Sequence, residues 1–227
     1  EDIKSIIALQ EEIVAEVKPE KREIPEEESN KDLAAAVDKS LGSDIERVIQ
    51  RAVHICNAGK CNRLILHYSG HGTQVPDSAT DRDEVDMRDE ALVPVDWNTA
   101  GFIADDWLHA AVIERLHKRV RVFCLIDACH SGTAMDLQWR YAARHRRAAQ
   151  HGRRVGAQSA SAVMISGCRH SQYSYETFDR KYGRVGAMSA AFLHTIRRGR
   201  RRPAHAIVKT MRRRLARQGY PQRPVLS

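Results

Sequence analysis

Two short apolar runs, each closing on a reactive side chain between glycines, constrain the fold of this chain most. They cover residues 63–68 and 120–126. The first leads into Ser-Gly-His-Gly and the second into Asp-Ala-Cys-His-Ser-Gly. Short apolar runs that stop at glycine are typical of buried strands. A third run, over residues 162–167, has the same character, so the sequence predicts three buried strands.

Helical patterns alternate with these strands. Apolar residues recur at helical spacing from residue 43 and again after Asp105, and further helices are predicted near 186–198 and 204–218. Either Asp105 or Asp106 is a candidate cap for the second helix. Strands that alternate with helices predict an α/β fold, a three-layer sandwich with a mainly parallel sheet and helices on both faces.

The ends of the first two predicted strands carry His71 and Cys129. Because ligands bind beyond the carboxyl ends of parallel strands, we expect both side chains in one cleft. A thiolate attacks a carbonyl carbon and an imidazole protonates the departing amine. The amides of Gly72 and Cys129 are candidates for an oxyanion hole, and a helix starting after Cys129 would favour the thiolate. Taken singly, His71 would be interpreted as a turn histidine and Cys129 as a buried structural thiol. Their occurrence together at consecutive strand ends, with glycines beside them, favours the catalytic interpretation.

An ordered series of motifs resembles the metacaspases, within the caspase-like cysteine peptidases. HYSGHGT at 67–73 and DACHSG at 127–132 are similar to the two active-site motifs of that family. The similarity continues through DEALVPVDW, IADDWL, SGCRHSQYS and GAMSAAF, and it covers residues 43–227. The resemblance implies the caspase-like form of the α/β fold, with His71 and Cys129 as the catalytic dyad.

The resemblance also implies one caspase-like domain in all. Residues 43–136 would be its large-subunit-like catalytic region and residues 161–227 its small-subunit-like region. Residues 137–160, rich in Arg, His, Gln and Ala, would be a mobile basic linker between them. Residues 1–42 would be an incomplete N-terminal part with an acidic linker, because the family normally opens with a strand that this chain lacks.

A carboxylate two residues before Cys129 bears on the choice of substrate. The resemblance implies that Asp127 and Ser69 line a pocket for a basic P1 side chain, since a buried carboxylate pairs well with Arg or Lys. We therefore expect protein or peptide substrates that are cleaved after Arg or Lys. The alternative for Asp127 is a cap of the helix expected after Cys129.

Acidic residues crowd residues 77–96, within a predicted acidic loop at 73–97. Like charges this close repel one another unless water or a cation neutralises them, and oxygen-only ligands suit calcium. The resemblance implies activation by calcium, with Asp86, Asp105, Asp106 and Asp136 as its ligands. A solvated acidic surface and, for Asp105, an ordinary helix cap are the alternatives.

The net charge of +8 is unevenly distributed, with −7 over residues 1–50, −4 over 51–136 and +19 over 137–227. Part of the basic excess is a group of linker arginines within 140–154. An enzyme that cuts after basic residues would cleave this linker, so we predict calcium-triggered autocleavage there. The remaining basic runs have no interleaved aromatic residues or recognisable binding module, and a nucleic-acid partner is therefore not expected.

Five cysteines, an odd number, predict no disulfide framework and favour a reducing compartment. No apolar run approaches the ~20 residues of a membrane span. We expect a monomer in the cytoplasm, with the nucleus as an alternative location. The competing interpretation of the function is a catalytically inactive caspase-like scaffold or a nucleic-acid-associated protein.

Overall fold

A computed structural model describes residues 44–76, 88–142, 147–150, 160–168, 173–197 and 202–227. Residues Gly42–Ser227 form one compact unit. The predicted N-terminal part at 1–42, most of the acidic segment and part of the basic linker lie outside the described residues.

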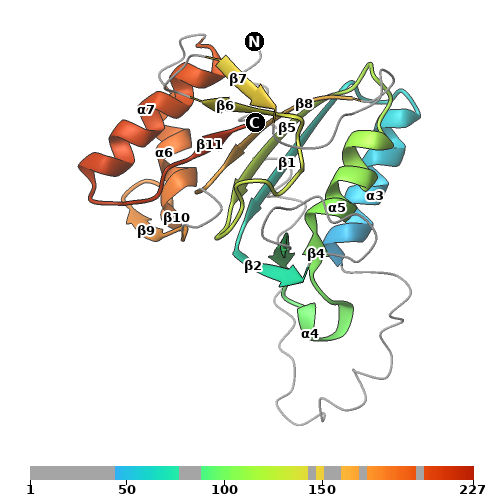
Figure 1. The fold of residues 1–227 in the computed structure, drawn as a ribbon, viewed down its shortest axis with the longest axis horizontal. Coiled ribbons are helices and arrows are strands. Elements are labelled where there is room, and N and C mark those ends of the chain that lie inside the picture. Colours follow the sequence, from blue (N-terminus) through green and yellow to red (C-terminus); the bar gives the residue numbers. More distant parts are fainter. Residues whose placement is uncertain (1–43, 77–87, 143–146, 151–159, 169–172, 198–201) are drawn as a thin grey trace. The chain divides into compact units, whose positions relative to one another are not determined.

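A four-stranded sheet forms the centre of this unit (Figure 1). Strands β1, β5 and β8 are parallel, and β11 joins β8 antiparallel. The sheet is therefore mainly parallel, and the three predicted strands are confirmed. Their predicted burial holds for β5 and for the second half of β8, whereas β1, at the edge of the described sheet, has no buried residue. In spatial order, the strands are β1 (Arg63–Ser69), β5 (Arg121–Asp127), β8 (Ser161–Ser166) and β11 (Val225–Leu226).

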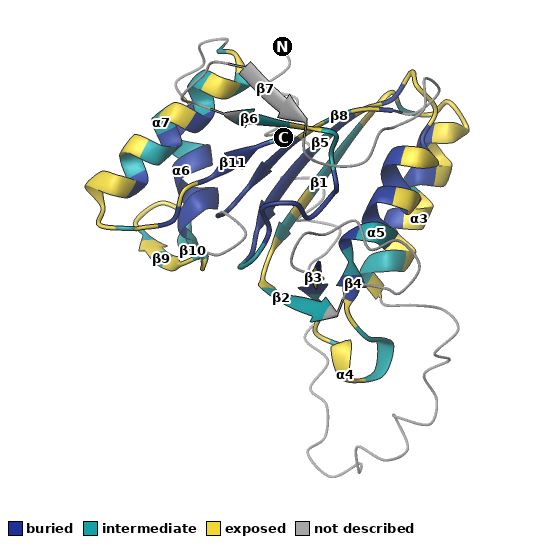
Figure 2. Ribbon diagram, in the orientation of Figure 1, coloured by how far each residue is buried: buried dark blue, intermediate teal, exposed yellow. Residues whose placement is uncertain are grey.

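Helices flank this sheet on both sides, as the α/β prediction requires (Figure 1). On one side, α3 packs against β1 and against the helical segment formed by α5 and η2. On the other side, α6 contacts β5 and packs against α7. Figure 2 shows α6 largely buried and α7 with an exposed outer face. The bounds are α3 (Asp44–Asn57), α5 (Asp105–Leu108), η2 (His109–Glu114), α6 (Ala187–Ile196) and α7 (Ala204–Arg217).

The helix predicted after Asp105 differs from a regular α-helix. It begins at Asp105, so Ala104 takes the position before the helix and neither aspartate is its cap residue. After Leu108 the chain continues as the π-helical turn η2. The expected apolar stripe is nevertheless confirmed, since Leu108, Val112 and Leu116 are all fully buried in the core.

Three smaller sheets complete the described part of the unit. The predicted loop at 73–97 is partly strand, because it contains most of β2 and all of β3, which pair antiparallel. At the end of that loop, α4 (Trp97–Ala100) follows β3, and β4 is the third strand of the same sheet. The predicted mobile linker contains the paired strands β6 and β7. The bounds are β2 (His71–Pro76), β3 (Arg88–Val93), β4 (Ile103–Ala104), β6 (Trp139–Ala142), β7 (Arg147–Gln150), β9 (Glu176–Asp179) and β10 (Gly183–Gly186).

Two cysteines expected to be free form a disulfide. Cys56, in the last turn of α3, is bonded to Cys61, just before β1. A disulfide framework is recognised by several cysteines at regular spacing. One bridge between cysteines five residues apart produces no such pattern, so the sequence does not indicate it. Cys124, Cys129 and Cys168 are free thiols. Among the described residues, no helix is both long enough and apolar enough to span a membrane.

Candidate active site

The register of the central sheet brings the two predicted catalytic segments together. Ser69, the last residue of β1, lies opposite Asp127, the last residue of β5. A side chain at Gly72 would put its Cβ 2.1 Å from the Cys129 carbonyl oxygen, so these two backbones are in direct contact. Only glycine permits this approach. The exposed His71 and the half-buried Cys129 therefore lie on adjoining segments at one edge of the sheet.

The Cys129 sulfur has a backbone partner that the sequence does not indicate. The amide N–H of Ser174 donates a hydrogen bond to Sγ over 3.3 Å. This donor suits a sulfur that carries negative charge during a reaction. The prediction of a helix after Cys129 is wrong, because the chain runs through turns from Ala128 to β6.

Asp127 is buried, and both of its carboxylate oxygens accept hydrogen bonds. The Ser174 hydroxyl donates to Oδ1, and the Ser189 amide N–H donates to Oδ2 over 2.8 Å. Ser189 is the third residue of α6. Gly186, the residue before this helix, has no side chain that could cap it. Asp127 therefore caps the distant helix α6, and not a helix following Cys129 as the alternative supposed.

Two glycines pack directly against the carboxylate of Asp127. A Cβ at Gly167 would lie 2.9 Å from Oδ1 of Asp127, and one at Gly186 would lie 2.1 Å from Oδ2. A Cβ at Gly186 would also lie 3.2 Å from the Ser69 hydroxyl oxygen, so Ser69 lies close to the same carboxylate. The buried Gln222 accepts from the Tyr175 amide and donates to the Gly167 carbonyl, and it steadies the backbone on this side.

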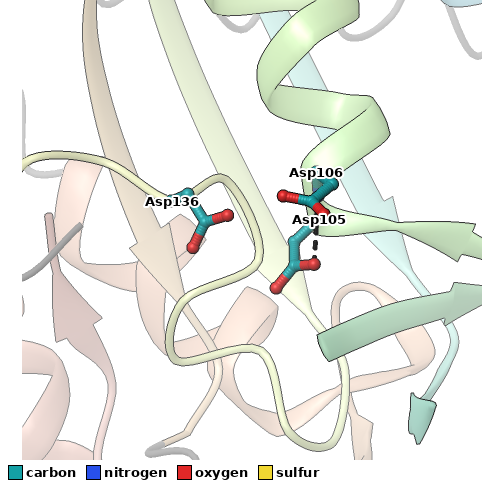
Figure 3. A group of neighbouring side chains, drawn as sticks. All are labelled: Asp105, Asp106 and Asp136. Atoms are coloured by element: carbon teal, nitrogen blue, oxygen red, sulfur yellow. Dashed lines mark hydrogen bonds between the residues drawn. The ribbon is translucent and has the colours of Figure 1, made fainter. Parts of the chain in front are cut away.

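The structure brings three of the four predicted calcium ligands together. One oxygen from each of Asp105, Asp106 and Asp136 lies within 4.8 Å of the others. Figure 3 shows that they come from two segments, the start of α5 and the loop after β5. The fourth predicted ligand, Asp86, lies outside the described residues.

The charge of this cluster favours a cation. Burial and the negative charges of Asp136 and Glu90 raise the pKa of Asp105 to about 9. Calcium binds oxygen at about 2.3–2.6 Å, so two of its ligands lie up to about 5 Å apart. The spacing of the three oxygens and their hard, anionic character therefore fit a calcium ion.

The buried His109 connects the two segments that carry these aspartates. Its Nδ1–H donates to the carbonyl of Met135 over 2.9 Å, and Asp136 is the next residue. Sequence reasoning missed His109. Its position four residues after Asp105, on the same side of the helical segment, is the signal that would have found it.

Together these features define an α/β protein in which a free thiol, a histidine and a buried carboxylate lie on adjoining segments at the ends of two parallel strands. Residues 3–138 match the family model described as "Metacaspase, peptidase C14 domain". This chain belongs to that family, which consists of cysteine peptidases.

Similar proteins agree with this membership. Metacaspase-1 of Arabidopsis thaliana is 38% identical over 153 residues, covering 63% of this chain and 40% of its own length. Metacaspase-1A of Aspergillus clavatus is 30% identical over 225 residues, with 79% and 52% covered. The chain thus spans about half the length of these curated relatives. The crystal structure of protein GSU0716 from Geobacter sulfurreducens is 25% identical with a TM-score of 0.51, and covers 87% of this chain and 80% of its own.

Proposed function

We propose that this chain is a cysteine endopeptidase that cleaves protein substrates after Arg or Lys. The observation that carries the proposal is the buried carboxylate of Asp127, two residues before Cys129, with Gly167 and Gly186 packed against its two oxygens. A substrate guanidinium or ammonium group that reached this carboxylate would pair with its negative charge. The nearby Ser69 hydroxyl would supply a further polar contact.

In the proposed reaction, His71 takes the proton of the Cys129 thiol, and the sulfur attacks the scissile carbonyl carbon to form a C–S bond. The carbonyl oxygen gains negative charge, which the nearby backbone amides of Gly72 and Cys129 would stabilise. His71 donates a proton to the amine nitrogen as the C–N bond breaks, leaving a thioester. Water then attacks the thioester with His71 as the base, releasing the acid and restoring the thiol.

The same proposal includes calcium, held by Asp105, Asp106 and Asp136. Bound calcium would offset the negative charge of the three clustered carboxylates and join the start of α5 to the loop that follows Cys129. Since Asp136 lies seven residues after Cys129, ordering this loop would order the nucleophile's surroundings. We further propose that the active protein cleaves its own linker within 140–154 and works as a monomer.

Fluorogenic peptides test the proposal directly. We expect turnover of peptides ending in Arg or Lys, dependent on calcium, and none of a peptide ending in Asp. Cys129→Ala should abolish turnover, whereas Cys168→Ala removes a neighbouring free thiol and should leave most of it. A folded protein that cleaves neither basic peptide with calcium would favour the inactive scaffold instead.

A further inference from the structure

A cavity of about 360 Å³ lies between α6 and α7 and involves none of the residues discussed above. The end of α6 contributes His194 and Thr195 to its wall. The rest of the wall is dominated by guanidinium groups. We call this cavity the arginine pocket, after Arg202, Arg213, Arg214 and Arg217.

The arginines face the cavity because of the register of α7. Arg213, Arg214 and Arg217 lie three, four and seven residues after Thr210, which also lines the cavity, so all four share one face of the helix. The apolar face of α7 is a different one, formed by the buried Val208, Met211 and Leu215. A helix face beside a neighbouring helix is usually apolar, and here it is cationic.

The guanidinium groups of the arginine pocket are not paired with a carboxylate in the described part of the chain. None of its four guanidinium groups has an ion pair or a side-chain hydrogen bond there, and Nε of Arg214 is buried without an acceptor. Residues 180–227 contain 14 Lys and Arg and no Asp or Glu. The last carboxylate before them, Asp179, is bound to His194 over 2.6 Å.

Cations in the last turn of a helix do offset the partial negative charge of its C-terminus. That effect accounts for Arg214 and Arg217 in the last turn of α7. It does not account for Arg202, which precedes α7 and lines the same cavity. Four like charges around one small cavity repel one another, and a bound polyanion would remove that repulsion.

We propose that the arginine pocket binds an oligophosphate, meaning several linked phosphate groups as in tripolyphosphate or the phosphate chain of a nucleotide. Guanidinium groups bind phosphate oxygens with paired hydrogen bonds, and this favours phosphate over other anions. One phosphate would engage one or two of the arginines, whereas a chain of three has enough oxygens for all four. The volume lies at the small-molecule scale of binding pockets, which favours a compact ligand.

Calorimetric titration of the full chain tests this proposal, with Cys129→Ala used to prevent any self-cleavage. Tripolyphosphate is titrated at a constant ionic strength of about 0.15 M, where exposed charges are well screened. The test variant is Arg213→Gln with Arg217→Gln. The matched control is Lys209→Gln with Arg223→Gln, which removes the same charge from equally exposed residues outside the pocket.

We expect one tripolyphosphate per chain, with affinity at least about tenfold weaker in the pocket variant and changed less than about twofold in the control. Thermal unfolding verifies that both variants are folded. ATP in place of tripolyphosphate identifies the source, because tighter binding of ATP indicates a nucleotide and equal binding indicates the phosphate chain alone. Both results support the proposal.

Three results would overturn it. The first is no binding of tripolyphosphate by the unaltered pocket. The second is an equal loss of affinity in the two variants, which indicates a general effect of positive charge. The third is binding of a glutamate peptide or a single-stranded oligonucleotide more tightly than tripolyphosphate, since either would place another class of ligand at these residues.

Discussion

Asp127 illustrates how one side chain serves both the fold and the proposed chemistry. Its carboxylate caps the N-terminus of α6 by accepting a hydrogen bond from the Ser189 amide. The same carboxylate is proposed to bind the basic side chain of a substrate. The sequence indicates that Asp127 is a carboxylate and that it lies two residues before Cys129. It does not indicate which helix Asp127 caps, because Ser189 lies 62 residues further along the chain.

Substitution of Asp127 separates these two roles. Asp127→Asn retains an oxygen for the Ser189 amide and loses the charge, so kcat/KM for Arg peptides should fall by about a hundredfold or more. Asp127→Ala loses the cap as well, and its free energy of unfolding should be lower than that of Asp127→Asn by about 1 kcal/mol. Steady-state kinetics and urea unfolding measure the two effects. Equal activity of Asp127→Asn and the wild type would contradict the proposed recognition of basic residues.

Asp105 gives a second prediction at the residue scale. Its pKa in the folded protein, about 9, is above the ordinary value of 3.8, so folding favours the protonated acid. In the absence of calcium, its contribution to stability is therefore complete below about pH 4 and is lost as the pH rises towards 9. Asp105→Asn should raise the melting temperature of the calcium-free protein more at pH 8 than at pH 5.

The same variant should also lose the stabilisation that calcium gives the wild type. Melting temperatures with calcium and with a chelator, at both pH values, measure these differences. Glu114→Gln is the control, because it removes an exposed carboxylate from the end of the same helical segment. Equal stabilisation of Asp105→Asn and the wild type by calcium would argue against a metal at this cluster.

Among the elements, the β6–β7 hairpin limits where the linker can be cut. Arg140 lies within β6 and is paired with Ala149 of β7. A peptidase needs a substrate backbone that is free to enter its cleft, and a paired strand is not. Arg147, the first residue of β7, is paired with Ala142 in the same way. The other linker arginines, at positions 144, 146, 153 and 154, lie outside the described residues.

We therefore expect calcium-triggered cleavage within 140–154 to occur after arginines other than Arg140 and Arg147. Mass spectrometry of the fragments identifies the sites. Arg140→Gln should leave the pattern unchanged, whereas Arg144→Gln with Arg146→Gln should alter it if those arginines are used. A principal cut after Arg140 would show that the hairpin opens readily, and cuts after non-basic residues would contradict the proposed specificity.

At the scale of the whole molecule, the linker joins two segments that pair in the centre of the sheet. β5 precedes the linker and β8 follows it, and the two strands form a parallel ladder from Arg121 and Ser161 onward. Cleavage of the linker therefore leaves the central pairing and the surrounding core intact.

The cleaved protein should accordingly remain one particle. We expect both fragments to elute together in size-exclusion chromatography under native conditions and to separate only in denaturant. The uncleaved Cys129→Ala protein provides the reference elution volume. Separation of the fragments without denaturant would show that the covalent linker, and not the sheet, holds the two parts together.

The sequence by itself determined the α/β class, the three central strands and the segments that carry His71 and Cys129. Apolar runs closed by glycine and helical spacing are local signals, and the order of motifs identified the family. Only the tertiary structure revealed which distant groups meet. Ser174 and Ser189 reach Asp127 from other elements, and His109 bonds to the loop carrying Asp136. Such contacts depend on strand register and helix placement, which no local pattern of residues encodes.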